Sequence, residues 1–217
     1  ASAAVIALNI CDGFHNLPQA FHTALFQVAT LVSSTGFATA DFNLWPELSR
    51  TILVLLMFMG ACAGSTGGGF KVSRLMIVAR AAKNEMLNMM HPRSVQQVHI
   101  NGRRVPDNVV KTALCYMTVY VFIVLGSVLL VSIDNFDMTT NFTAVLATMN
   151  NIGPGLGAVG PTGNFGGFSV FSKLILMFDM LVGRLELFPV LVLFAPGMWR
   201  LPARRSRKEF HKMDDLD

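Results

Sequence analysis

Two long uncharged stretches constrain what this chain can fold into. Residues 51–70 and 112–133 contain no Asp, Glu, Lys or Arg. A helix over the second stretch is about 33 Å long at 1.5 Å per residue, which is enough to cross a hydrocarbon core of roughly 30 Å. A third apolar stretch, residues 174–199, is also long enough, although it contains three charged residues. The sequence therefore predicts an all-α integral membrane protein.

The composition agrees with this interpretation and excludes several other classes. Charged residues make up 14% of the chain and hydrophobic residues 53%, whereas an average soluble domain carries about 25% charged residues. Such a chain is too hydrophobic to be disordered. The three cysteines form no CxxC pair, and Cys11, His15 and His22 fit no metal-ligand spacing, so neither a disulfide scaffold nor a metal centre is expected. We find no nucleophile–base pair, and we expect neither an enzyme nor a cofactor.

The distribution of charge predicts a membrane topology. Residues 71–111 contain eight basic residues against two acidic ones, and residues 134–172 contain no basic residue. Because Lys and Arg are retained on the cytoplasmic side of inserted helices, 71–111 and the C-terminus should be cytoplasmic, and 12–50 and 134–172 external. The basic clusters are not interleaved with aromatic residues and belong to no recognition fold, so no nucleic-acid partner is expected.

Each predicted external segment contains a short apolar stretch that does not suit a plain loop. Residues 17–32 and 138–152 are too short to span a membrane, and their length suits re-entrant half-helices. Each stretch runs into a small, polar, glycine-bearing return, at residues 33–37 and 150–155. A spanning segment follows each return. The predicted unit is a helix, a re-entrant half-helix, a return and a second helix, and it occurs twice.

The two copies of this unit can be aligned. The Ala-Thr pairs at 29–30 and 147–148 match at an offset of 118, and Gly36 and Gly153 match at 117, so the alignment needs one deletion. Repeats of this size in a membrane chain commonly mark transport folds. A chance likeness between two apolar segments is the alternative.

The returns suit the coordination of a cation. Irregular backbone at membrane depth is tolerated only where it is packed in protein or lines water. A glycine-containing return can point successive carbonyl groups at one axis, where they replace the hydration shell of an ion. The carbonyl end of a half-helix also carries the negative end of the helix dipole, which favours a cation.

Glycines interrupt the helix that follows the first return. Five of the residues 60–69 are glycine, and each costs a helix about 1 kcal/mol relative to alanine. The run lacks the GK[ST] ending of a phosphate-binding loop. Two interpretations remain open, namely close helix packing through small residues and a flexible intramembrane loop that obstructs a pore.

Arg184 falls at the corresponding depth of the second copy. The return glycine and Gly67 are 31 residues apart in the first copy, and the return glycine and Gly183 are 30 apart in the second. A charge well inside a span is costly and usually faces a water-filled interior. In a cation pathway it would raise the barrier to permeation. An ion pair with Asp179 or Glu186, or structural anchoring, is the alternative.

Four motifs together resemble a known family. They are SSTGF at 33–37, GACAGSTGGGFK at 60–71, NNIGPGLG at 150–157 and GRLELFPVLVLF at 183–194. In this combination the chain resembles the membrane pore subunit of the Trk/Ktr potassium transporter superfamily, closest to the TrkH type, over essentially residues 1–200. That resemblance implies a potassium-channel-like fold, in which four helix–half-helix–helix units surround one pore.

The resemblance also implies how the chain divides. Residues 1–91 correspond to the third unit with its first helix truncated, and residues 107–200 correspond to the fourth, which makes two of an expected four. Between them, 92–106 form a cytoplasmic hairpin or linker, where Asn-Gly at 101–102 is typical of a tight turn. Residues 201–217 form a charged cytoplasmic tail.

Site residues follow from the same resemblance. It implies a selectivity filter at eight residues: Ser34, Thr35, Gly36, Phe37, Asn151, Ile152, Gly153 and Pro154. Within that filter, K⁺ is expected at Thr35, Gly36, Ile152 and Gly153. It implies a gate at seven further residues: Gly64, Ser65, Thr66, Gly67, Gly68, Gly69 and Arg184.

The predicted function is potassium uptake across the bacterial cell inner membrane, through a gated cation-conducting subunit whose pore loops face the periplasm. The implied partners are the remaining N-terminal half of the pore, a second copy in a homodimer, a cytosolic nucleotide-binding regulatory subunit and the lipid membrane. The residues leave channel-like and ion-coupled (symporter) transport open. The alternative function is a non-conducting membrane scaffold, which would have no reason to keep two glycine-bearing returns.

Overall fold

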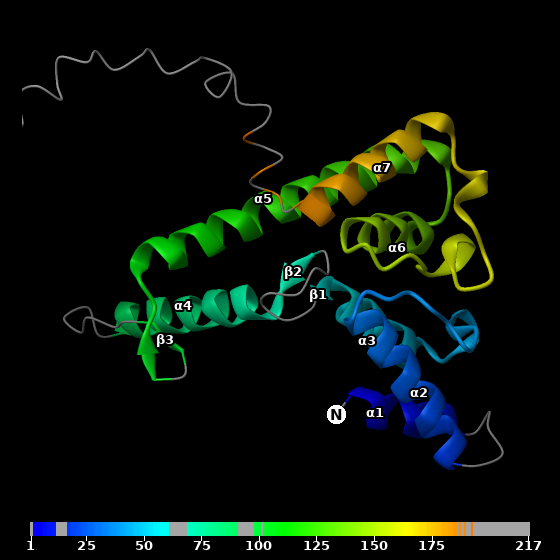
Figure 1. The fold of residues 1–217 in the computed structure, drawn as a ribbon, viewed down its shortest axis with the longest axis horizontal. Helices are drawn as coiled ribbons and strands as arrows, with labels where there is room; N and C mark the ends of the chain where they lie inside the picture. Colours follow the sequence, from blue (N-terminus) through cyan, green and yellow to red (C-terminus); the bar gives the residue numbers. More distant parts are fainter. Residues whose placement is uncertain are drawn as a thin grey trace, which may run out of the picture. The chain divides into compact units, whose positions relative to one another are not determined.

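The described part of the chain is mainly helical, as the sequence predicts. The computed structural model describes residues 2–11, 17–60, 69–90, 98–100, 102–185, 187, 189 and 192. Ala1–Leu187 form one compact unit. Figure 1 shows the order and arrangement of its helices.

The first copy of the repeat consists of α1 (Ser2–Ile10), α2 (Leu17–Val32) and α3 (Glu47–Phe58), which pack against one another. The bounds of α2 coincide with the predicted half-helix. Ala20 and Ala24, one helical turn apart on α2, are both fully buried, so they lie on the face that packs. The chain then passes through an extended return and a short 3₁₀ helix, η2 (Phe42–Leu44), before α3 begins.

The second copy repeats this order with α5 (Asp107–Val131), α6 (Met138–Met149) and α7 (Val170–Leu185). Short 3₁₀ helices lie between them: η3 (Ser132–Asp134), η4 (Gly157–Val159) and η5 (Phe165–Gly167). Packed against both α5 and α7, the short helix α6 is buried along most of its length. Helix α6 ends at Met149 and not at the predicted residue 152, so the next residues belong to the return.

An N-terminal cap fixes where α6 begins. The carboxylate of Asp137 accepts a hydrogen bond of 3.1 Å from the backbone N–H of Thr140, which satisfies one of the donors left free at a helix start. Two hydrogen bonds from Thr140 lower the pKa of the Asp137 carboxyl below its ordinary value, and the bond from the Thr140 side chain has the larger effect. The cap therefore stays ionised near neutral pH.

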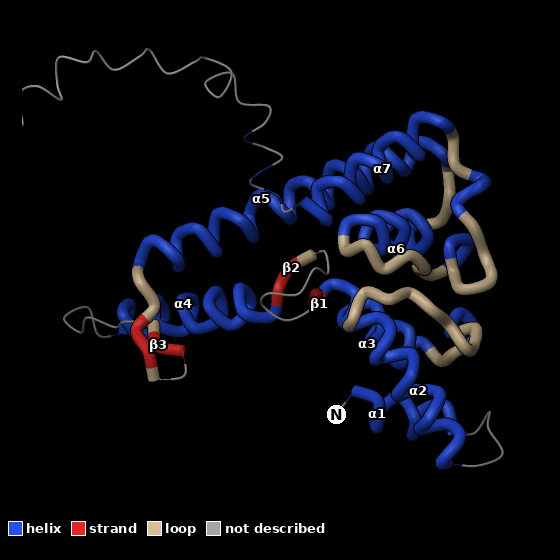
Figure 2. Tube along the Cα trace, viewed as in Figure 1, coloured by secondary structure: helices blue, strands red, loops and turns tan. Residues whose placement is uncertain are grey.

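Two small strand pairs accompany the helices (Figure 2). Strand β1 (Met59–Gly60) follows α3 directly and pairs in parallel with β2 (Phe70–Lys71), which leads into α4 (Val72–Met90). The helix thus ends where the glycine run begins, as its composition predicts. Residues 61–68 of that run lie outside the described residues.

The hairpin predicted from Asn-Gly is present. Strand β3 (His99–Ile100) pairs antiparallel with β4 (Arg103–Arg104). Gly102, in the turn, has φ 76°, which glycine adopts without the strain of a Cβ. A guanidinium nitrogen of Arg80 donates to the carbonyl oxygen of His99, so the hairpin is attached to α4.

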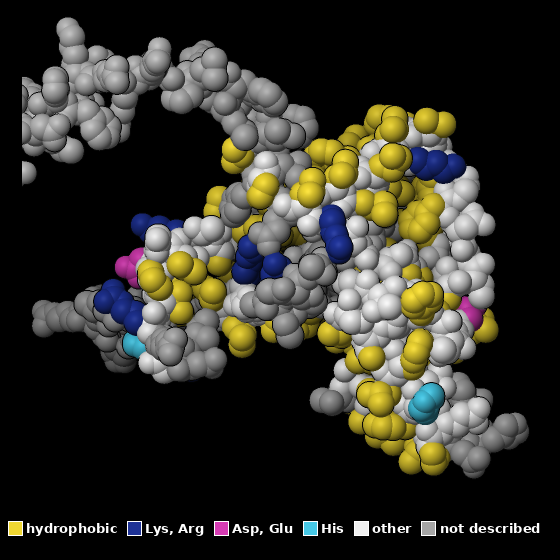
Figure 3. Space-filling view, in the orientation of Figure 1, with side chains coloured by type: hydrophobic (Ala, Val, Ile, Leu, Met, Phe, Trp, Pro, Cys, Tyr) yellow, Lys and Arg dark blue, Asp and Glu magenta, His cyan; other side chains and the backbone are white. Residues whose placement is uncertain are grey.

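Long apolar helix faces remain exposed. Among the described helices, a single stretch is long and apolar enough to cross a membrane by itself, Asp107–Asp134, with a mean hydropathy of 2.4. On α5, Phe122 is 71% exposed and Leu129 is 72% exposed, and Val170 and Leu174 are exposed on α7. On the face drawn in Figure 3, hydrophobic side chains spread over α7, α1 and α2, and Lys and Arg side chains gather around α4 and the hairpin. Exposed apolar faces of this extent suit contact with lipid.

A side-chain amide joins the loops of the two copies. Oδ1 of Asn43 accepts a hydrogen bond from the backbone N–H of Gly157 (2.9 Å), and Nδ2 of Asn43 donates to the carbonyl oxygen of the same residue (3.2 Å). Nearby, the Thr162 hydroxyl donates to the carboxylate of Asp41 (3.2 Å). These bonds hold the segment after the first return against the segment after the second.

Candidate functional site

The first return begins at the end of α2 with a fixed backbone pattern. The N–H of Thr35 donates to the carbonyl oxygen of Thr30 at 2.9 Å. Ser34 has φ 54° and Gly36 has φ 78°. The residue before Thr35 and the residue after it therefore both adopt left-handed conformations. A non-glycine residue pays a steric cost for this conformation. The hydroxyl oxygen of Ser34 is buried without a hydrogen-bond partner.

The second return has the same backbone pattern. The N–H of Ile152 donates to the carbonyl oxygen of Ala147 at 2.9 Å, and the left-handed residues are Asn151 (φ 52°) and Gly153 (φ 105°). Every residue of this pattern lies 117 positions after its counterpart in the first return. The spacing is constant through the end of the half-helix, so the offset of 118 that the Ala-Thr pairs suggested is wrong there and no deletion is needed.

The two returns meet at Gly36. A Cβ on Gly36 would lie 1.9 Å from the carbonyl oxygen of Ile152 and 3.2 Å from Cδ of Pro154. Two reasons therefore require glycine at position 36, namely its positive φ angle and this close contact. A Cβ on Gly153 would meet no atom within 4 Å, so only the dihedral angle requires glycine there.

The predicted filter residues are thus brought together, and they differ in exposure. Thr35, Gly153 and Phe37 are exposed, the last of them at 70%, whereas Ile152 is buried. The Thr35 hydroxyl lies 2.7 Å from the hydroxyl of Ser33. Thr35 and Phe37 of the first return therefore lie at the surface of the unit.

A hydroxyl inside the second copy supports its return. Oγ1 of Thr143, on α6, accepts a hydrogen bond of 2.9 Å from the N–H of Leu156 and donates to the carbonyl oxygen of Thr139. The return is therefore tied back to the half-helix that precedes it. Irregular buried backbone needs such partners, because an unsatisfied group costs about 1–3 kcal/mol.

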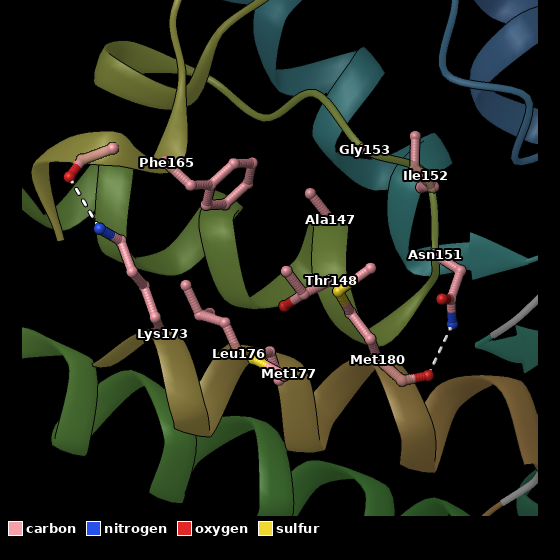
Figure 4. Close-up of a pocket in the computed structure, with 11 residues that line it drawn as sticks. Ala147, Thr148, Asn151, Ile152, Gly153, Phe165, Lys173, Leu176, Met177 and Met180 are labelled. Atoms are coloured by element: carbon pink, nitrogen blue, oxygen red, sulfur yellow. Dashed lines mark hydrogen bonds between the residues drawn. The ribbon is translucent and has the colours of Figure 1, made fainter. Parts of the chain in front are cut away.

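A cavity of about 520 Å³ borders the second return (Figure 4). It lies between α6, the return and α7, and its lining includes Asn151, Ile152 and Gly153. Nδ2 of Asn151 donates to the carbonyl oxygen of Met180 on α7 (3.2 Å), and Lys173 donates to the carbonyl oxygen of Gly166 (2.9 Å) at the far end. The lining is mostly apolar, with these polar groups at its edges.

The predicted gate residues are only partly located. Gly64, Ser65, Thr66, Gly67 and Gly68 lie outside the described residues. Gly69 has φ 82°, and a Cβ there would lie 1.7 Å from Oδ1 of Asn150, at the end of α6.

Arg184 follows a residue, Gly183, that also lies against the end of α6. A Cβ on Gly183 would lie 1.9 Å from the carbonyl oxygen of Met149, the last residue of α6. Arg184 itself is exposed in the last turn of α7. Gly69 and Gly183 therefore both abut the carbonyl end of α6.

Two buried polar residues were missed by reasoning from the sequence. Asp179 is fully buried on α7, and one of its carboxylate oxygens accepts a hydrogen bond of 2.8 Å from the hydroxyl of Ser127 on α5. Asn150 is fully buried and bonds to two other helices. Two consecutive asparagines after an apolar half-helix were the available signal for Asn150. An acid in a spanning segment was the signal for Asp179, whose partner is Ser127 and not the predicted Arg184.

The family of the chain follows from a match over most of its length. Residues 14–200 match the TrkH family, described as a cation transport protein. The chain belongs to this family, and the resemblance inferred from its motifs is confirmed. The family transports cations, so the expectation that the chain is not an enzyme is confirmed too.

Individual relatives support the same assignment. The chain is 36% identical over 200 residues to the Trk system potassium uptake protein TrkH of Salmonella typhimurium strain LT2. The aligned residues cover 90% of this chain and 41% of that protein. It is 32% identical over 188 residues to the Trk system potassium uptake protein TrkG of Escherichia coli strain K12, covering 87% of this chain and 38% of that one.

A solved structure is similar as well. The crystal structure of the potassium transporter TrkH from Vibrio parahaemolyticus matches with a TM-score of 0.80 at 35% identity, covering 91% of this chain and 42% of that chain. The chain thus spans about two fifths of the length of the relatives it matches.

The contact at Gly183 makes a first prediction. Gly183→Ala should lower the stability of the protein, because its Cβ would overlap the Met149 carbonyl oxygen. Gly126→Ala is the matched control, since Gly126 lies inside α5 and a Cβ there meets no atom within 4 Å. That change should be neutral or should stabilise by up to about 1 kcal/mol through helix propensity. Thermal unfolding in detergent measures both, and equal shifts of the two variants would contradict the close approach of α7 to α6.

Proposed function

We propose that this chain forms part of a potassium uptake transporter in the bacterial cell inner membrane, with the two returns contributing half of an ion-selectivity filter. The observation that carries the proposal is the shared backbone pattern of the two returns, with the same hydrogen bond and with left-handed residues 117 positions apart. Such strained backbone persists only where the surrounding structure holds it. A scaffold that used its helices only for packing would need neither return.

Potassium is bound, in this proposal, by backbone carbonyl groups of Thr35, Gly36, Ile152 and Gly153, with Ser34, Phe37, Asn151 and Pro154 completing the returns. Carbonyl oxygens replace the water that a cation loses on entering. The carbonyl ends of α2 and α6 point into the returns and add their negative dipole ends. The names of the relatives TrkH and TrkG, potassium uptake proteins, support potassium as the ion.

Two units need further units to enclose a pathway. In this proposal, the exposed residues of the first return and the cavity beside the second are the two open sides of a half ring. We propose that an N-terminal half of the pore occupies both sides. A four-unit pore then dimerises with a second copy of the whole assembly.

The gate, in this proposal, consists of the glycine-rich residues Gly64 to Gly69 together with Arg184. Its support is the position of Gly69 and Gly183, which both abut the carbonyl end of α6. The positive charge of Arg184 would oppose cations at that level until the glycine-rich segment moves. A cytosolic nucleotide-binding subunit would act through α4, to which the β3–β4 hairpin is attached by Arg80.

Gly36 tests the filter. Gly36→Ala should lower the preference for K⁺ over Na⁺ strongly, because the added Cβ overlaps the Ile152 carbonyl oxygen. The effect of Gly153→Ala should be smaller, since that change meets no atom and costs only the dihedral strain, about 1–2 kcal/mol. Competition between rubidium and sodium uptake in the assembled transporter measures the preference. Unchanged selectivity in both variants, with normal insertion, would remove the returns from the ion pathway.

Arg184 tests the gate. Arg184→Ala should raise the basal ion flux in the absence of the regulatory subunit by about tenfold or more, because a nearby positive charge costs a permeating cation several kcal/mol. Lys173→Ala is the matched control, since Lys173 is a cation of the same helix but bonds to the external loop at Gly166. Its basal flux should match that of the parent. Flux into liposomes measures both, and equal flux in all three proteins would place the barrier elsewhere.

Topology is tested by labelling. In a protein whose native cysteines are replaced by serine, Thr162→Cys should react with an impermeant thiol reagent in intact cells, and Arg104→Cys should not. Both positions are exposed, so a difference in labelling reports the side of the membrane. Opening the cells should make Arg104→Cys react as well. Labelling of Arg104→Cys alone in intact cells would reverse the whole arrangement.

A further inference from the structure

Asn150 stands at the junction between α6 and the second return, and both ends of its side-chain amide are bonded. Its Oδ1 accepts a hydrogen bond of 3.0 Å from the hydroxyl of Tyr120 on α5. Its Nδ2 donates a hydrogen bond of 2.9 Å to the carbonyl oxygen of Met57 on α3. Asn150 is fully buried, so these bonds fix the end of α6 against two other helices.

The Met57 carbonyl is available because α3 stops there. The last four carbonyl groups of a helix have no intrahelical donor, and α3 ends at Phe58, where the chain turns into β1. Met57 is itself fully buried, and a buried carbonyl group without a donor costs about 1–3 kcal/mol. The amide of Asn150 therefore supplies a donor that α3 lacks, from the other copy of the repeat.

The Tyr120 hydroxyl is held in position by neighbouring rings. The ring of Tyr120 lies edge-on to Phe58 with centroids 5.6 Å apart, and it also contacts Phe70 and Tyr116 at 6.2 and 6.4 Å. Phe70 belongs to β2, and the guanidinium of Arg74, on α4, lies 4.1 Å from the centroid of the Tyr116 ring. Such ring contacts stabilise one orientation. The donor to Asn150 is thus positioned by residues on both sides of the glycine run.

Gly69 touches the same oxygen atom. A Cβ on Gly69 would lie 1.7 Å from Oδ1 of Asn150 and 2.6 Å from its Cγ. Only glycine lets the backbone that enters β2 pass this close to the amide. The contact connects the segment before α4 to Asn150, the first residue of the second return.

We propose that Asn150 is a positioning residue for ion selectivity, which sets the place of the second return through Tyr120 and Met57 and senses the backbone at Gly69. The residue after it, Asn151, is the first left-handed residue of the return. A shift of Asn150 therefore displaces the Ile152 carbonyl oxygen that lies against Gly36. The inference rests on the proposed function, in which that return contacts the ion.

The first test removes one or both hydrogen bonds of Asn150 in the assembled transporter. Tyr120→Phe keeps the ring and loses only the donor to Asn150, and Asn150→Leu keeps the approximate volume and loses both bonds. Tyr120→Phe should lower the preference for rubidium over sodium about five- to tenfold, the equivalent of one hydrogen bond, and Asn150→Leu should lower it further. Tyr116→Phe, in the same ring cluster, is the matched control and should leave the ratio unchanged. A ratio of two uptake rates does not depend on how much protein folds.

The second test uses the contact with Gly69. Gly69→Ala should lower the selectivity ratio although residue 69 belongs to neither return, because its methyl group pushes Asn150. Combined with Asn150→Ala, which removes the overlapping amide atoms, Gly69→Ala should cause little further loss. Independent sites would instead give additive effects. Additive losses would overturn the contact as the route of the effect.

The outcomes separate this inference from the proposed function. If Gly36→Ala loses selectivity and the Tyr120 and Asn150 variants keep it, the return is a filter and Asn150 does not position it. If the Gly36 variant also keeps its selectivity, the filter itself is wrong. Should Asn150→Leu fail to insert, Tyr120→Phe and Gly69→Ala still decide, because neither removes a buried side chain.

Discussion

The contact between Gly36 and the carbonyl oxygen of Ile152 is the constraint on which the arrangement of the two copies depends. It sets two irregular backbone segments side by side without an intervening side chain. Backbone of this kind cannot satisfy its polar groups by regular structure, so the surrounding residues must do so. The side-chain amide of Asn43 accepts a hydrogen bond from the N–H of Gly157 for this purpose. The hydroxyl of Thr143 accepts one from the N–H of Leu156. The apolar helices provide the frame, and a few buried amides and hydroxyls determine where the returns lie.

Much of the frame could be predicted from the sequence because it depends on local patterns. The helix at 17–32, the end of α3 at the glycine run and the hairpin at Asn-Gly all follow from composition and turn chemistry. The pairing of β1 with β2 could not be predicted, since it joins two dipeptides across a segment whose path no local pattern fixes. The repeat was recognisable, but its offset at the end of the half-helix was wrong by one residue, because matching residue types are a weaker guide than matching hydrogen bonds.

The contacts that determine the candidate site were harder to predict, for a physical reason. Returns with glycine can be recognised because glycine marks unusual dihedral angles. Which carbonyl group an Asn amide meets depends on the packing of helices that are distant in sequence, as with Asn150 and Met57. The bond between Ser127 and Asp179 is of the same kind. An acid inside an apolar span signals an interaction, but the partner becomes known only when the helices are packed.

The glycines of this chain then fall into classes that composition alone does not distinguish. Three glycines let a different segment approach one small region, the carbonyl end of α6 and the return that follows it. They are Gly36, Gly69 and Gly183. Gly126, on α5, has open space around it, and no other segment approaches it within 4 Å. The approaches of Gly69 and Gly183 to the end of α6 leave that end little freedom to move independently of β2 and α7. Movement of α7 would therefore reach the end of α6 through a backbone contact, and movement of α4 would reach the return through the hydrogen-bonded amide of Asn150.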